Sequence, residues 1–151
     1  MSAVGADSFA IEGTSEGGLY AVRATFRLGP TVGEDRRVDR RREIRIEVDH
    51  DSGVSARFLR MTVMVNDLVT WAGALERVSA GDHGTAKLET THGDPLIEIE
   101  CHLDQGKRNR ELAGWQVTVG KIGPGWNLTV TLDASRDSAS TVASALRRAL
   151  K

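Results

Sequence analysis

The strongest constraint on the fold is an alternation of apolar and polar residues that recurs along the chain. It is clearest in four stretches, at residues 44–48, 85–90, 96–103 and 115–132. Because successive side chains of a β-strand point to opposite faces of the sheet, each stretch can bury one face and expose the other. The sequence therefore predicts an antiparallel sheet with one apolar face turned toward a core.

Further strands extend this pattern toward the N-terminus. Residues 9–11 alternate in a short strand. A longer strand at residues 20–28, in which Tyr20 shares the inward parity, is expected to stop at Gly29 and Pro30. These segments add two strands to the predicted sheet.

A hairpin with an irregularity is predicted in the middle of the chain. Residues 49–53 combine aspartate, histidine, serine and glycine, which favours a turn between two strands. In the return strand, Ala56 and Phe58 share one parity, whereas Leu59 and Met61 share the other. The parity shift near Phe58 predicts a β-bulge, because one extra residue moves the following side chains to the other face.

Two segments have the spacing of amphipathic helices. Apolar residues recur three and four positions apart at Leu68, Trp71, Leu75 and Val78. Asn66 is expected to cap this helix and Gly81 to end it. Asp137 or Ser138 is predicted to cap a second helix, which has an apolar stripe at Val142, Ala145, Leu146, Ala149 and Leu150.

Together these elements predict an α+β fold, with a twisted antiparallel β-sheet of about seven to eight strands and two helices packed on one face. Residues 1–7 are expected to be flexible, and residues 8–151 to form a single domain. No internal repeat is visible in the sequence.

Composition narrows the class of protein. A chain of 151 residues is long enough for a core of its own, and its formal net charge of −1 produces no strong field of one sign. Cys101 is the only cysteine, which excludes an intrachain disulfide and fits a reducing compartment. There is no run of about 18 apolar residues and no signal-like start, so we expect no membrane segment and a cytoplasmic location.

Residues with metal-binding or catalytic chemistry do not form a recognisable site in the sequence. His83 and His92 lie at opposite ends of one predicted strand, roughly 30 Å apart at about 3.3 Å per residue, so they cannot share an ion within one chain. Cys101 falls on an inward position, where a thiol is inert. No nucleophile elbow or phosphate-binding loop is present. The sequence predicts a protein that is not an enzyme and that needs no cofactor.

Basic residues gather in two segments that are predicted to be surface loops. Residues 31–42 contain almost nothing apolar, and the loop at 104–111 is also basic. The cations of these segments and of the strand that follows the first are Arg36, Arg37, Arg40, Arg41, Arg42, Arg45, Lys107, Arg108 and Arg110. They offer contacts for phosphates, but acidic residues are interleaved with them, and Trp71, Trp115 and Trp126 all fall on apolar parities. A nucleic-acid-associated regulator is therefore kept as the alternative function.

The span from residue 43 to the C-terminus carries a pattern of packing and turn residues that has a counterpart in a known group. Its parts are Gly53-Val54-Ser55-Ala56, Asp67-Leu68 with Trp71 ahead of Leu75, Gly81 and Gly84, Leu96-Ile97-Glu98-Ile99-Glu100, an antiparallel pair and a terminal helix. This pattern resembles small bacterial proteins related to the WapI-type immunity proteins, together with uncharacterised actinobacterial families. An excess of arginine over lysine is also typical of GC-rich bacteria.

The resemblance implies a protein that binds and neutralises a cognate toxin in the cytoplasm. Its motifs are structural, so it transfers no functional residue. We therefore interpret the chain as a non-enzymatic protein-binding module. The candidate interaction surface is the polar sheet face or the two basic segments: Glu98, Glu100 and His102, or Arg36, Arg37, Arg40, Arg41, Arg42, Lys107, Arg108 and Arg110. The predicted partner is a protein, with nucleic acid second.

Overall fold

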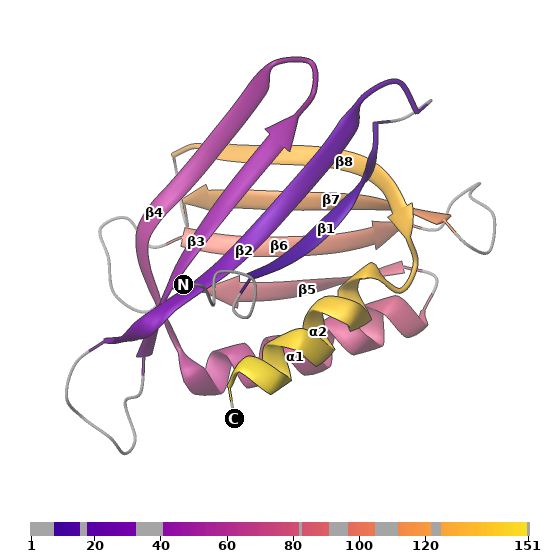
Figure 1. Ribbon diagram of the computed structural model, residues 1–151. Coiled ribbons are helices and arrows are strands. Elements are labelled where there is room, and N and C mark those ends of the chain that lie inside the picture. The colour runs from indigo at the N-terminus through magenta and orange to yellow at the C-terminus, as the bar shows by residue number, and fades with distance from the viewer. Residues whose placement is uncertain are drawn as a thin grey trace.

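The structure is a computed structural model that describes residues 8–15, 18–32, 41–81, 83–90, 97–104, 112–121 and 125–150. Its strands are β1 (Ser8–Thr14), β2 (Ala21–Val32), β3 (Arg41–His50), β4 (Val54–Met64), β5 (His83–Glu89), β6 (Ile97–Asp104), β7 (Leu112–Lys121) and β8 (Asn127–Ser135). Its helices are α1 (Val65–Ala80) and α2 (Ser138–Ala149). The described strands form one antiparallel sheet in the order β4-β3-β2-β1-β8-β7-β6-β5, which confirms the predicted α+β class (Figure 1).

The sheet consists of two similar units. Each unit is a meander of four strands followed by a helix, first β1 to β4 with α1 and then β5 to β8 with α2. The strands of the two units run in clearly different directions in Figure 1, so the sheet is strongly curled. The helices are exchanged between the units, because α1 packs against β5 and α2 packs against β1. The structure thus contains a repeat of architecture that the sequence does not reveal.

The two units meet at a narrow junction between β1 and β8. Their ladder contains a single pair of Cα partners, Thr14 and Asp133. A Cβ atom added at the neighbouring Gly13 would lie 2.0 Å from the carbonyl oxygen of Asp133. Glycine at this position therefore allows the backbones of the two units to approach each other.

The inward residues of both units and the apolar sides of both helices form one core. Trp71 of α1 and Trp115 of β7 are among its largest fully buried side chains. The ring of Trp71 meets that of Phe26 edge to face, with centroids 5.4 Å apart, as the predicted packing of Trp71 on the sheet requires. Trp115 keeps its indole N–H satisfied by donating to the carbonyl oxygen of Ser135 at 3.1 Å.

The predicted hairpin and β-bulge are both confirmed. Ile46 pairs with Phe58, whereas Ile44 pairs with Met61, so two residues of β4 lie opposite Arg45 alone. The extra residue returns Met61 to the core, as the parity shift requires. Leu59, however, was predicted to face inward and is 52% exposed, because it lies within the bulge.

The predicted end of the second strand is wrong. Strand β2 continues through Gly29 and Pro30 to Val32, and its last two residues pair with Arg42 and Arg41 of β3. A register shift after Leu28 accommodates this segment. Such an irregularity is the place where a strand tolerates a proline, which has no N–H for the ladder.

The helix boundaries confirm part of the predicted capping. Helix α1 begins two residues earlier than expected, after Met64, so the predicted cap at Asn66 is wrong, whereas its end at Gly81 is confirmed. Helix α2 begins after Asp137 as predicted, but the Asp137 side chain does not cap it. Instead the Ser140 N–H donates to the Ser79 hydroxyl of α1 at 2.9 Å, so one helix supplies a cap to the other.

Within the described part of the chain, neither helix has the length and hydrophobicity that a membrane span requires.

Candidate functional site

The predicted basic segments are only partly described by the structure. Arg36, Arg37, Arg40, Lys107, Arg108 and Arg110 lie outside the described residues. Arg41 and Arg42 were predicted to lie in a loop, but they belong to β3 and are half-buried. The Arg42 Nε donates to the carbonyl oxygen of Gly29 at 2.7 Å, so this side chain contributes to the β2–β3 pairing.

The three predicted positions of the polar sheet face all lie on β6, an interior strand of the sheet. The Cα partners of Glu98 are Glu89 and Gly120, those of Glu100 are Lys87 and Thr118, and those of His102 are Thr85 and Gln116. Alternation along the strand places the three residues on one face. Their neighbours Thr85, Lys87, Glu89 and Gln116 are exposed.

Trp126 shares the predicted apolar parity of Leu128, Val130 and Leu132, but the expectation that it is not exposed is wrong. Its side chain is 45% exposed and stacks on Phe58 of β4, with ring centroids 5.7 Å apart and planes inclined by 12°. The β7–β8 ladder ends at the pair of Gly120 and Asn127, so Trp126 precedes the strand. Parity does not determine the direction of a side chain outside the ladder.

The β1–β2 turn and the β3–β4 turn of the first unit lie side by side, at the end of the sheet that is farthest from the helices (Figure 1). The turn between β3 and β4 joins the start of β2, because the Asp51 N–H donates to the carbonyl oxygen of Ala21 at 3.0 Å. The rings of Tyr20 and His50 meet with centroids 5.3 Å apart. The positive φ of Gly53, 111°, closes the β3–β4 turn.

Apolar side chains are exposed where these turns meet. Leu19 is 75% exposed, Val54 57% and Tyr20 38%, which makes Leu19 the most exposed large apolar residue of the described chain. We refer to Leu19, Tyr20, His50, Asp51 and Val54 as the turn-end surface. Tyr20 was predicted to face the core, but it precedes the first residue of β2 and lies outside the ladder.

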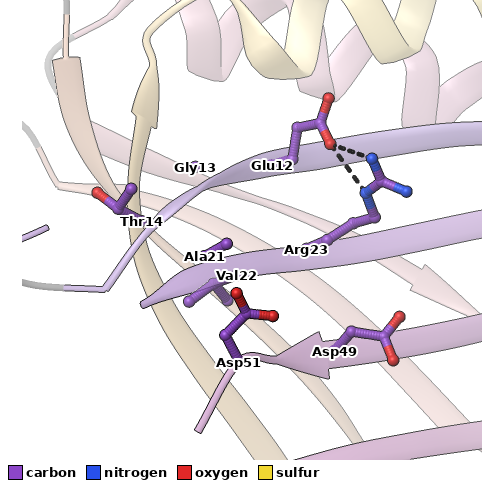
Figure 2. Close-up of a pocket in the computed structure, with 8 residues that line it drawn as sticks. All are labelled: Glu12, Gly13, Thr14, Ala21, Val22, Arg23, Asp49 and Asp51. Atoms are coloured by element: carbon purple, nitrogen blue, oxygen red, sulfur yellow. Dashed lines mark hydrogen bonds and ion pairs between the residues drawn. The ribbon is translucent and has the colours of Figure 1, made fainter. Parts of the chain in front are cut away.

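A depression of about 450 Å³ lies beside the turn-end surface (Figure 2). It is lined by Glu12, Gly13, Thr14, Ala21, Val22, Arg23, Asp49 and Asp51. The Arg23 guanidinium turns toward Glu12, with its Nε and one terminal nitrogen 2.8 and 2.6 Å from the same carboxylate oxygen. Within the described chain, Asp49 and Asp51 form no ion pair. Three carboxylates and one guanidinium therefore give the lining an excess of negative charge.

Among the described residues there is no group of three or more histidine, cysteine, aspartate or glutamate side chains arranged to hold a metal ion. The depression is open to solvent and its charged side chains lie on the outer face of the sheet (Figure 2). What the arrangement offers is a surface with exposed apolar groups next to Asp49 and Asp51, whose carboxylates form no ion pair with a described residue.

Comparisons with known proteins add little to this description. No protein-family model and no curated protein matches the sequence. Among solved structures, the chain is similar to a plant transcriptional regulator, PBF-2, with a TM-score of 0.49 and 9% sequence identity over 95% of this chain and 79% of that chain.

Proposed function

We propose that this protein is a non-enzymatic binding module that engages a partner protein through the turn-end surface. The observation that carries the proposal is the exposure of Leu19, Tyr20 and Val54 together, next to two carboxylates, Asp49 and Asp51, that form no ion pair with a described residue. Large apolar side chains that gather on a surface with a polar rim are typical of interaction sites. The partner surface that fits has apolar side chains flanked by lysine or arginine.

The free energy of burying a few exposed apolar side chains is large enough to support a binding interface. Burying an exposed leucine or valine is worth about 1.5–3 kcal/mol, so Leu19 and Val54 can act as anchors of an interface. Asp49 and Asp51 lie at the rim, where complementary charge raises the association rate and the specificity more than the affinity.

The more specific form of the proposal is neutralisation of a bacterial toxin in the cytoplasm. It derives from the sequence resemblance to immunity-type proteins, and an acidic and apolar surface is compatible with a basic toxin. A module of this kind acts by covering its partner, which requires no cofactor and no catalytic group.

The experiment is a comparison of proteins captured from a lysate of the source organism by the immobilised wild-type chain and by surface variants. Leu19→Ser is expected to lose the specific partner, and Asp51→Lys to weaken its capture. Leu112→Ser and Glu89→Lys make the same changes at exposed positions of β7 and β5, and both are expected to retain the partner. Titration of the purified partner should show a loss of at least tenfold in affinity for Leu19→Ser, since a buried leucine is worth about 1.5–3 kcal/mol.

A partner retained equally by Leu19→Ser and Leu112→Ser would contradict the turn-end surface as the binding site.

Nucleic acid is the second candidate partner. The sequence pattern predicts no exposed aromatic residue for base stacking, but Trp126 is exposed and offers one. Retention of nucleic acid that falls steeply with salt and is lost in Trp126→Ala would favour this second candidate over protein binding.

A further inference from the structure

One edge of the sheet is open in the described part of the chain. The sheet ends at β4 on one side and at β5 on the other. No described strand pairs with the outer side of either edge strand. Helix α1 packs mainly against β5 and contacts β4 only slightly, so β4 is the edge left open. An antiparallel edge strand directs the N–H and C=O groups of every second residue away from its neighbour, where they can pair with another strand.

The regular part of this edge is five residues long. Residues 54–58 pair with β3 in an unbroken register, from His50 opposite Val54 to Ile46 opposite Phe58. The bulge at Leu59 then bends the strand and ends the regular stretch. We call residues 54–58 the β4 edge, and its length is that of an ordinary strand.

The two faces of the β4 edge differ in chemistry. Val54, Ala56 and Phe58 alternate on one face. There Val54 is 57% exposed at one end, and Phe58 stacks on Trp126 at the other end. Ser55 and Arg57 occupy the opposite face, and both are exposed. Successive side chains of a strand added here would lie alternately beside apolar and polar side chains of β4.

The charges of the neighbouring strands indicate which kind of side chain fits beside the polar face of the β4 edge. Glu12, Arg23 and Asp49 are Cα partners across β1, β2 and β3, so the sign of the charge alternates from strand to strand. In the next row Glu47 lies opposite Arg57 and forms an ion pair with Arg27 at 3.3 Å. Arg57 itself has no ion pair with a described residue. Opposite charges on adjacent strands stabilise their pairing, so the side chain that continues this row is a carboxylate.

We propose that the β4 edge takes up an extended segment of a partner protein as an additional strand. The segment carries an aspartate or glutamate opposite Arg57 and apolar side chains beside Val54 and Phe58. The partner's backbone pairs with the unpaired groups of β4, and the carboxylate sets the register, as in other complexes formed by strand addition. This inference rests on the proposed function in so far as the occupant belongs to a protein.

The test is a titration of the isotope-labelled full chain with two five-residue peptides, followed by NMR. The probes are acetyl-Val-Glu-Val-Thr-Val-amide, which in antiparallel register sets its glutamate opposite Arg57 and its terminal valines opposite Phe58 and Val54, and the same peptide with lysine in place of glutamate. The acidic peptide is expected to shift the amide signals of residues 54–58 and to bind roughly threefold more tightly than the basic one. Arg57→Glu should reverse this order. Lys87→Glu, the same change on the other edge strand, should leave it unchanged.

The outcomes separate this inference from the proposed function. Amide shifts outside the β4 edge, or equal binding of both peptides, would overturn strand addition and leave capture through Leu19 unaffected. A concentration-dependent dimer in sedimentation, with amide shifts at residues 54–58 and no peptide binding, would identify a second copy of the chain as the occupant and would also contradict the inference. Loss of partner capture by Leu19→Ser has no bearing on either peptide.

Discussion

Gly13 shows how a single residue sets the relation between the two units. Its position at the β1–β8 junction leaves no space for a side chain, since a Cβ atom would lie 2.0 Å from the Asp133 carbonyl oxygen. Gly73 of α1 differs, because the closest atom to its added Cβ is a guanidinium nitrogen of Arg77 at 3.5 Å, an ordinary contact. A side chain is therefore excluded at Gly13 and can be accommodated at Gly73.

Substitution of these glycines should change stability in opposite directions. Gly13→Ala is expected to lower the free energy of unfolding by about 1–3 kcal/mol, because the backbones of β1 and β8 must separate. Gly73→Ala is expected to raise it by about 0.5–1 kcal/mol, because alanine has the higher helix propensity. Urea denaturation of the two variants measures both changes. Equal stabilities for Gly13→Ala and the wild type would contradict the close approach at the junction.

At the scale of elements, the structure shows which sequence patterns were sufficient to predict a strand, a bulge or a helix. The bulge followed from the parities of Phe58 and Met61, because only an extra residue can keep both in the core. The alternation at residues 115–132 falls on β7 and β8, and helical spacing placed Trp71 in α1, where its ring meets Phe26 of the sheet. Each of these patterns repeats over several residues, and the face that it predicts to be apolar is the face that packs in the core.

Local signals at the ends of elements were less reliable. Gly29-Pro30 did not stop β2, because β3 continues to pair beyond it, and Asn66 did not cap α1. Tyr20 and Trp126 were misplaced for one reason, since both lie one residue outside a ladder. The turn-end surface could not be derived from the sequence, because it depends on two turns that are about 30 residues apart and meet through Asp51 and Ala21.

The contact between the two helices leads to a prediction at this scale. Ser79 is buried at 8% exposure, and its hydroxyl accepts a hydrogen bond from the N–H of Ser140 in the first turn of α2. Ser79→Ala should lower the free energy of unfolding by about 1–2 kcal/mol, because the part-buried N–H of Ser140 loses its partner. Ser144→Ala, at an exposed position of α2, serves as the control and should change stability little. Identical denaturation midpoints for the two variants would show that the hydroxyl is not a cap.

At the scale of the whole molecule, the exchange of helices makes the two units depend on each other. Helix α1 follows β4 but packs on β5, and α2 follows β8 but packs on β1. One core contains residues of both units and both helices. Because the direct ladder between the units is a single pair, most of their cohesion comes from this shared burial.

Unfolding is therefore expected to be a single cooperative transition. Calorimetric and van't Hoff enthalpies should agree, and near- and far-ultraviolet circular dichroism should give the same midpoint. Gly13→Ala should lower this midpoint without splitting the transition. Two resolved transitions would mean that the units are stable independently, in conflict with the exchanged helices.

The same exchange has a consequence for synthesis on the ribosome. When the first four strands and α1 have emerged, Trp71 can meet Phe26 of β2, but β5 and α2, which also pack against α1, have yet to be translated. The nascent chain must carry this part of the helix surface uncovered until the second meander follows it out of the exit tunnel. Native structure should accordingly form late in translation, and a holdase chaperone has a defined segment of the nascent chain to shield in the interval.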